Sequence, residues 1–251
     1  MTELVLLALA GFVGGAMNAL AGGGSFVTLP ALIAAGVPSV AANTSSSVAL
    51  YPAGAVSAWV YRGGLTRVCG VPLRPTLAVT LVGGLMGALL LLWTPSTIFD
   101  RVLPWLLLSA TATLFFGPRL RTLVQRRFQA SATLILSLQF MLGVYGGYFG
   151  GAVGLMMMSA WSLLDEADVK SLNPVKTLLV TAANTVAIIC FAVAGAVDWG
   201  AAAALGTGAI IGGYGGAHLG RRLPAAVIRW ATLIATAAIT VAFFGRAYFT
   251  G

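Results

Sequence analysis

The chain has 251 residues, of which 59% are hydrophobic and only 8% are charged. Soluble domains carry about 25% charged residues, so this composition excludes an ordinary water-facing surface and indicates a lipid bilayer as solvent. The net charge of +8 arises mainly from arginines in short clusters between apolar runs, a pattern typical of membrane topology rather than of a nucleic-acid-binding face.

Ten apolar segments follow one another along the chain and predict an all-α polytopic membrane protein. A β-barrel would instead alternate in polarity over stretches of about ten residues. The start of the chain carries Glu3 in place of a basic region, so we expect it to remain in the mature protein rather than to act as a signal peptide. The segments are 3–20, 25–36, 43–61, 75–93, 102–118, 130–149, 154–164, 173–196, 199–218 and 227–247.

Two of these segments are too short to cross a bilayer. A spanning helix needs about 20 residues, whereas the twelve residues of 25–36 rise only about 18 Å, and 154–164 is no longer. We therefore predict that each short segment forms a broken or re-entrant helical hairpin with the segment before it. Whether the short segments span or re-enter is left open.

The two halves of the sequence resemble each other at an offset near 130 residues. Asn43 aligns with Asn173 and Gly24 with Gly154, and after one residue of slippage a later glycine pattern is also repeated. We predict two copies of one fold, residues 1–125 and 126–251, which together form one transport domain. The later pattern is Gly83, Gly84 and Gly87, repeated as Gly212, Gly213 and Gly216.

The arginines lie mainly in three loops, near residues 62–74, 119–127 and 221–229. The positive-inside rule places these loops in the cytoplasm and both termini outside, in a multi-pass protein of the bacterial inner membrane. Corresponding loops of the two halves then lie on opposite sides, and an odd number of segments per half also requires inversion. Inverted-topology repeats are typical of secondary transporters, whose sites lie near the bilayer midplane at discontinuous helices.

Glycine-rich stretches interrupt both predicted helical hairpins. Glycine allows the backbone to turn sharply and to approach a ligand closely. The helices that follow would present free N–H groups and positive dipole ends to each other, which predicts an anion site without a charged side chain. The alternative is that these glycines serve only close helix packing. The candidate binding residues in these stretches are Asn18, Gly22, Gly23, Gly24, Ser25, Tyr148, Gly151 and Gly154.

A second group of candidate binding residues follows each short segment. Asn43, Thr44 and Ser45 form a polar cluster that either caps the next helix or binds substrate, and Asn173 is the counterpart of Asn43. Lys176 lies about one turn inside a predicted membrane segment, where an ammonium group is costly unless it is paired or hydrated. It either extends to the cytoplasmic surface or attracts an anionic substrate. The carboxylates of Asp165, Glu166 and Asp168 are close enough in sequence to neutralise it.

Other polar residues carry weaker predictions. Asn184 lies two turns deeper than Lys176 and either lines a path or joins two helices. His218 has a proton-relay role only as a minor alternative. Cys69 and Cys190 lack metal-ligand or redox-motif spacing, and no catalytic motif occurs. We therefore expect neither an enzyme nor a cofactor or metal.

The two glycine motifs, each with its downstream asparagine, resemble those of the TauE/SafE sulfite exporter family. The similarity covers nearly the whole chain, from Gly11-Phe-Val-Gly-Gly-Ala-Met-Asn18 through Ala42-Asn43 to Gly147-Tyr-Phe-Gly-Gly-Ala-Val-Gly154, Asn173 and Lys176. The resemblance implies export of small sulfur oxyanions or organosulfonates, such as sulfite, thiosulfate or sulfoacetate. Ala152 and Val153 depart from the glycines that are usual in the second copy.

The leading hypothesis is a secondary transporter or facilitator that exports a small anion by alternating access at a midplane site. Its expected partners are the anion and the bilayer, with no nucleic acid, and a homodimer is left open. The alternatives are an anion channel and a structural membrane subunit without transport activity. An intramembrane enzyme is disfavoured because catalytic residues are missing.

Overall fold

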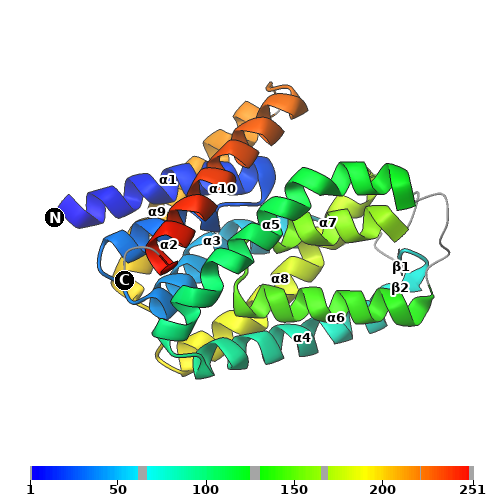
Figure 1. The fold of residues 1–251 in the computed structure, drawn as a ribbon, viewed down its shortest axis with the longest axis horizontal. Helices are drawn as coiled ribbons and strands as arrows, with labels where there is room; N and C mark the ends of the chain where they lie inside the picture. Colours follow the sequence, from blue (N-terminus) through cyan, green and yellow to red (C-terminus); the bar gives the residue numbers. More distant parts are fainter. Residues whose placement is uncertain (1, 62–66, 125–130, 165–168, 221, 249–251) are drawn as a thin grey trace.

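The structure is a computed structural model that describes residues 2–61, 67–124, 131–164, 169–220 and 222–248. Within these ranges the chain forms ten helices and one two-stranded hairpin (Figure 1). The first five helices are α1 (Thr2–Ala21), α2 (Ser25–Ala34), α3 (Ser39–Tyr61), α4 (Leu73–Trp93) and α5 (Ser96–Val124). The second five are α6 (Ala132–Tyr148), α7 (Val153–Leu164), α8 (Val169–Val193), α9 (Trp199–Gly220) and α10 (Ala225–Tyr248).

The predicted all-α polytopic membrane protein is confirmed. Five helices in the described ranges are long and apolar enough to cross a bilayer: α1, α4, α5, α8 and α10. The two short segments form α2 and α7, of 10 and 12 residues. At 1.5 Å per residue these helices are only about 15 and 18 Å long, against a hydrocarbon core of about 30 Å.

Three helices begin a full turn or more before the predicted segment, and one ends more than a turn after it. α5 starts at Ser96 rather than residue 102 and continues to Val124, while α3 and α8 begin at Ser39 and Val169. These added turns carry polar or charged residues, which hydropathy cannot separate from loops although their backbones remain helical.

The β-hairpin was not predicted. It pairs Arg67 with Pro72 and Val68 with Val71. Its two central residues, Cys69 and Gly70, have φ values of 47° and 80°. Positive φ at both central positions is what a tight two-residue turn requires.

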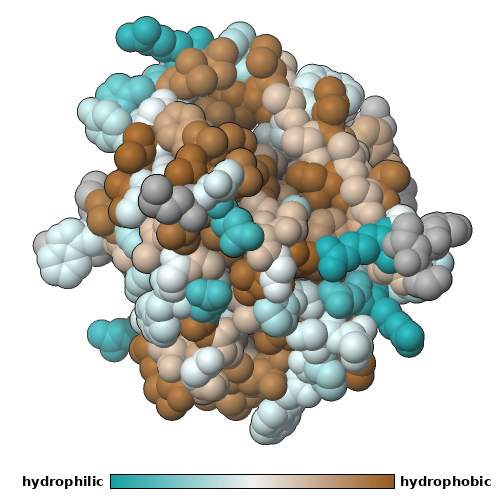
Figure 2. Space-filling view, turned by 90° about the vertical axis from the view of Figure 1, so that its left-hand side faces the viewer, coloured by the Kyte–Doolittle hydropathy of each residue, from teal (hydrophilic) through white to brown (hydrophobic). Residues whose placement is uncertain are grey.

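The chain has two distinct ends in Figure 1. The two termini lie at the left, near the start of α5, where the Tyr248 hydroxyl donates a hydrogen bond to the Arg101 carbonyl. We call this the terminal end, and it carries Asp100 near the start of α5 and Asp198 directly before α9. We call the opposite end the β end. It holds the β-hairpin, which includes Arg67, and the first turn of α4, which includes Arg74. Seen from the terminal end, polar residues are interspersed with apolar ones (Figure 2).

Two helices of the first group of five run in the opposite direction to their counterparts in the second group. In Figure 1, α1 runs from the terminal end towards the right, whereas α6 runs from right to left. α5 rises from lower left to upper right, and α10 descends in the opposite sense.

Glycines bring two helix pairs into backbone contact. α1 packs along α9, where a Cβ on Gly212 would lie 1.8 Å from the Phe12 carbonyl oxygen and one on Gly15 would lie 2.1 Å from that of Ala209. α6 packs along α4 in the same way, since a Cβ on Gly147 would lie 2.0 Å from the Gly84 carbonyl oxygen. Small residues at such interfaces let membrane helices approach closely where lipid offers no hydrophobic driving force.

The largest buried core lies around α2, α3 and the turns of the terminal end. It includes the fully buried side chains of Leu29, Leu32, Leu91, Phe99 and Leu103. The space between α3 and α8 is less completely filled towards the β end, and this is where the cavity lies.

Candidate functional site

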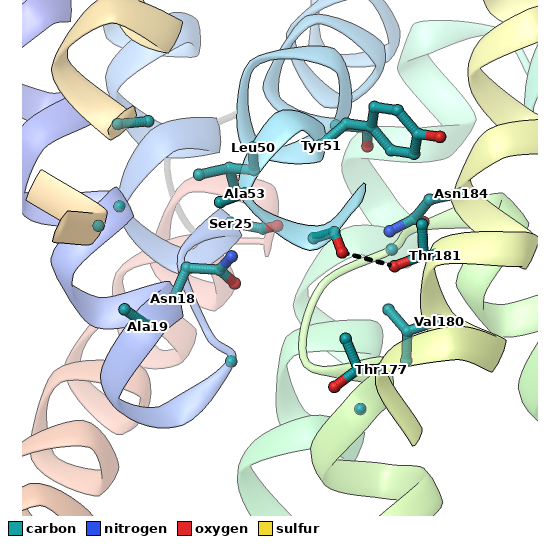
Figure 3. A pocket seen from close by; sticks show the side chains of 18 of the residues that line it. Asn18, Ala19, Ser25, Leu50, Tyr51, Ala53, Thr177, Val180, Thr181 and Asn184 are labelled. Atoms are coloured by element: carbon teal, nitrogen blue, oxygen red, sulfur yellow. Dashed lines mark hydrogen bonds between the residues drawn. The ribbon is translucent and has the colours of Figure 1, made fainter. Parts of the chain in front are cut away.

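A cavity of about 420 Å³ lies between α1, α3, α8 and α9, and the breaks of both helical hairpins reach it. In Figure 3, Asn18 of α1 lies opposite Thr177, Thr181 and Asn184 of α8, with Tyr51 of α3 beside them. The volume falls within the range of about 300–1,000 Å³ that is typical of small-molecule sites. The cavity therefore has the size of a site for a small solute.

Lys176 supplies a cationic side chain to this cavity. Its methylene stem lies against Gly154, because a Cβ on that glycine would come within 3.3 Å of the Lys176 Cδ atom. Of the carboxylates that the structure describes, Glu3, Asp100 and Asp198, none lines the cavity. The carboxylates of Asp165, Glu166 and Asp168, which we considered as partners for Lys176, lie outside the described residues.

Neutral hydrogen-bonding groups complete the wall. Asn18 and Ser25 face the cavity from α1 and α2, and Ser47 and Tyr51 face it from α3. Tyr51 and Thr185 share a hydrogen bond of 2.7 Å between their hydroxyl oxygens, which joins α3 to α8. Thr181 also donates to the Gly54 carbonyl at 3.2 Å, the bond drawn in Figure 3. Amides and hydroxyls beside one cation can hydrogen-bond an oxyanion without introducing negative charge.

Both helical hairpins break at a glycine with positive φ. Gly22 follows α1 with φ of 76°, and Gly150 follows α6 with φ of 74°. A Cβ on Gly150 would lie 3.4 Å from the Ser47 hydroxyl and 3.7 Å from Asn184 Oδ1. The second break therefore brings its backbone against polar groups of α3 and α8 at the inner wall of the cavity.

We expect Gly150→Ala to destabilise the protein by about 1–2 kcal/mol, because the left-handed backbone conformation is unfavourable for any residue with a Cβ. Thermal unfolding of the detergent-purified protein measures the effect as a lower Tm. Gly54→Ala is the matched control, since Gly54 also lines the cavity but has no positive φ. Equal Tm values for the two variants would contradict the prediction.

The candidate residues from the sequence separate into two groups in space. Those that line the cavity are Asn18, Gly22, Ser25, Gly154, Asn173 and Lys176. Those that lie away from its wall are Gly23, Gly24, Asn43, Thr44, Ser45, Tyr148 and Gly151.

Most of the second group is engaged in buried contacts between helices. A Cβ on Gly24 would lie 2.5 Å from the Gly14 carbonyl oxygen, so this glycine lets α2 approach α1. Asn43 Nδ2 donates to the Tyr148 carbonyl at 3.1 Å. Thr44 donates to the Ala196 carbonyl, and Ser45 accepts from the Asp198 N–H at 2.9 Å. The polar cluster of α3 thus joins distant segments.

Four polar residues of the cavity wall were not among the candidate binding residues from the sequence: Ser47, Tyr51, Thr177 and Thr181. For Thr177 and Thr181 the sequence does contain a helical pattern of polar residues. Asn173, Thr177, Thr181 and Asn184 recur at helical spacing and form one polar stripe along α8. Ser47 and Tyr51 follow the polar cluster of α3 at the same spacing, although apolar neighbours mask them.

Comparison with known proteins agrees with this architecture. Residues 7–243 match the family described as "Sulfite exporter TauE/SafE". The chain belongs to the TauE/SafE family. This confirms the resemblance noted from the glycine motifs and establishes a membrane transporter rather than an enzyme.

Three proteins similar to this TauE/SafE protein come from bacteria. It is 27% identical to "Probable membrane transporter protein ORF9" of Sinorhizobium sp. over 95% of this chain and 91% of the relative. It is 29% identical to "Probable membrane transporter protein YfcA" of Escherichia coli strain K12, covering 86% and 77% of the two chains. A "Probable membrane transporter protein" of Haemophilus influenzae is 30% identical over 86% of this chain and 84% of its own. No solved structure matches the chain.

Proposed function

We propose that this TauE/SafE protein is a secondary transporter or facilitator that exports a small anion, with sulfite, thiosulfate and organosulfonates as the leading substrates. One observation carries the proposal: the cavity combines Lys176 with amide and hydroxyl groups and is lined by none of the described carboxylates. Such a lining favours an anion and disfavours a cation, which would require negative or carbonyl ligands. The family description names sulfite, and the family relatives described above are named only as transporters.

The binding site consists of the cavity groups from both groups of helices. Lys176 provides the attractive charge, and Asn18, Ser25 and Asn173 provide hydrogen bonds. Ser25 and Val153 begin α2 and α7, whose first turns both contribute to the lining. The positive dipole ends of these turns add to the attraction for an anion.

Two inverted halves, residues 1–125 and 126–251, move against each other in this mechanism. The opposite directions of α1 and α6, and of α5 and α10, in Figure 1 support an inverted arrangement. The reciprocal packing of α1 on α9 and of α6 on α4 supports two related halves. Rocking of such halves about a central site gives alternating access.

The membrane orientation follows from charge. The β end carries Arg67 and Arg74. At the terminal end, Asp100 and Arg101 lie near the start of α5, Asp198 directly precedes α9 and Arg246 lies near the end of α10, so acidic and basic side chains balance there. The positive-inside rule therefore assigns the β end to the cytoplasm and both termini to the outside of a bacterial inner membrane. A negative interior then drives each negative charge outward by about 2.3 kcal/mol per 100 mV, so export requires no ATP.

Reconstitution in liposomes tests the proposal. We expect saturable flux of sulfite, thiosulfate or a sulfonate such as sulfoacetate, faster when an imposed potential drives the anion outward. A saturable, potential-dependent flux identifies a carrier, while currents that do not saturate identify a channel. Absence of flux for sulfite, thiosulfate and sulfonates alike would favour a structural subunit and contradict the proposal. Protein-free liposomes provide the background leak.

A further inference from the structure

Two asparagines at equivalent places in their helices have opposite environments. Asn43 is the fifth residue of α3, counted from Ser39, and Asn173 is the fifth residue of α8, counted from Val169. Asn43 is only 2% exposed, and its Nδ2 donates to the Tyr148 carbonyl. Asn173 is exposed and lines the cavity.

The bond of Asn43 closes the terminal end of the cavity. Tyr148 is the last residue of α6, directly before the break of the second helical hairpin, so the bond joins α3 to that hairpin. Thr44 and Ser45, both fully buried, bond to the turn between α8 and α9 at the same level. One helical turn further along α3, Ser47 already faces the cavity. The cavity therefore ends at this layer of hydrogen bonds.

In the described part of the chain, the β end of the cavity has no equivalent hydrogen bond from Asn173. Ala21 is the last residue of α1, as Tyr148 is the last residue of α6, and Gly22 directly after Ala21 lines the same cavity as Asn173. Among the residues that the structure describes, no hydrogen bond joins the Asn173 side chain to the first helical hairpin. One asparagine is engaged while its counterpart faces open space.

We propose that Asn43 and Asn173 are alternate gate residues, each closing one side of the cavity by bonding to the end of the opposite hairpin. In the present conformation Asn43 holds the terminal end shut. In the opposite conformation Asn43 releases Tyr148, and the Asn173 amide donates to the Ala21 carbonyl and closes the β end. This inference rests on the proposed alternating movement of two inverted halves. Thr44 and Ser45 follow Asn43, whereas Pro174 and Val175 follow Asn173. Asparagine is therefore the hydrogen-bonding side chain that the two gates share.

Cysteine crosslinking in native vesicles tests the gate. The pair Ala21→Cys and Asn173→Cys is placed in a background in which Cys69→Ser and Cys190→Ala remove the native thiols. A disulfide needs Cα atoms within about 7 Å, so oxidation traps conformations in which residues 21 and 173 approach this closely, as closure of the β end requires. We expect a measurable disulfide yield, and at least a threefold higher initial rate when Asn43→Ala weakens the terminal gate.

The control is Thr111→Val, which removes a buried hydrogen bond to Thr240 between α5 and α10, away from both gates. It should leave the crosslinking rate unchanged, whereas Ser45→Ala should raise it as Asn43→Ala does. No disulfide in vesicles whose parent protein transports anion would overturn the gate, as would equal rates in Asn43→Ala and Thr111→Val. If crosslinking occurs as expected but the protein transports none of the anions, the gate proposal is supported and the proposed substrate is contradicted.

Discussion

Replacing Lys176 with methionine should slow anion transport at least tenfold, while the yield of folded protein stays unchanged. Methionine keeps the apolar stem that packs on Gly154 but removes the charge from the cavity. Two unit charges about 4 Å apart interact by about 4 kcal/mol at an effective dielectric constant of 20. Losing even a third of this weakens binding about tenfold. Initial rates of uptake into proteoliposomes, measured below saturation, report the loss.

Two further variants separate charge from general disruption. Lys176→Arg keeps the charge and should retain more transport than the methionine variant. Arg229→Gln removes an exposed charge that bonds to the Phe115 carbonyl outside the cavity, and it should transport like the parent. Equal transport by the parent and Lys176→Met would show that Lys176 only extends to the surface.

Gly212→Ala should destabilise the protein by about 1–3 kcal/mol or more, whereas Gly215→Ala on the same helix should be neutral or stabilising. The new methyl group at residue 212 would lie 1.8 Å from the Phe12 carbonyl oxygen, so α1 and α9 would have to separate. Overpacking of this kind typically costs about 1–3 kcal/mol, and here the obstacle is backbone rather than a mobile side chain. At residue 215 a Cβ meets nothing within 4 Å.

The two substitutions are expected to change the Tm differently, which makes the pair informative. Alanine is favoured over glycine in a helix by about 0.5–1 kcal/mol, so the control variant should hold or raise the Tm. Thermal unfolding in detergent compares both variants with the parent. A Tm for Gly212→Ala equal to that of Gly215→Ala would contradict close backbone contact between α1 and α9.

Local composition was sufficient to locate the helices. The thickness of the bilayer requires long apolar runs, and each predicted run coincides with a helix, including the two that are too short to span. Helix ends were less predictable, as the extra turns of α5 show, because polar residues at an interface are compatible with helix and loop alike. The turn of Cys69 and Gly70 also escaped prediction, since its strands are only two residues long.

The sequence by itself determined the membrane class, the family, the positions of the helices and the presence of Lys176 within an apolar segment. Only the tertiary structure decided which polar residues face the cavity. Asn43 and Asn173 have the same place in their helices, but one bonds to Tyr148 and the other faces the cavity. The physical reason is that a polar side chain in a membrane needs a hydrogen-bond partner or a hydrated cavity. For Asn43 the partner is the Tyr148 carbonyl, more than 100 residues away in the chain. Sequence periodicity cannot identify a partner at that distance.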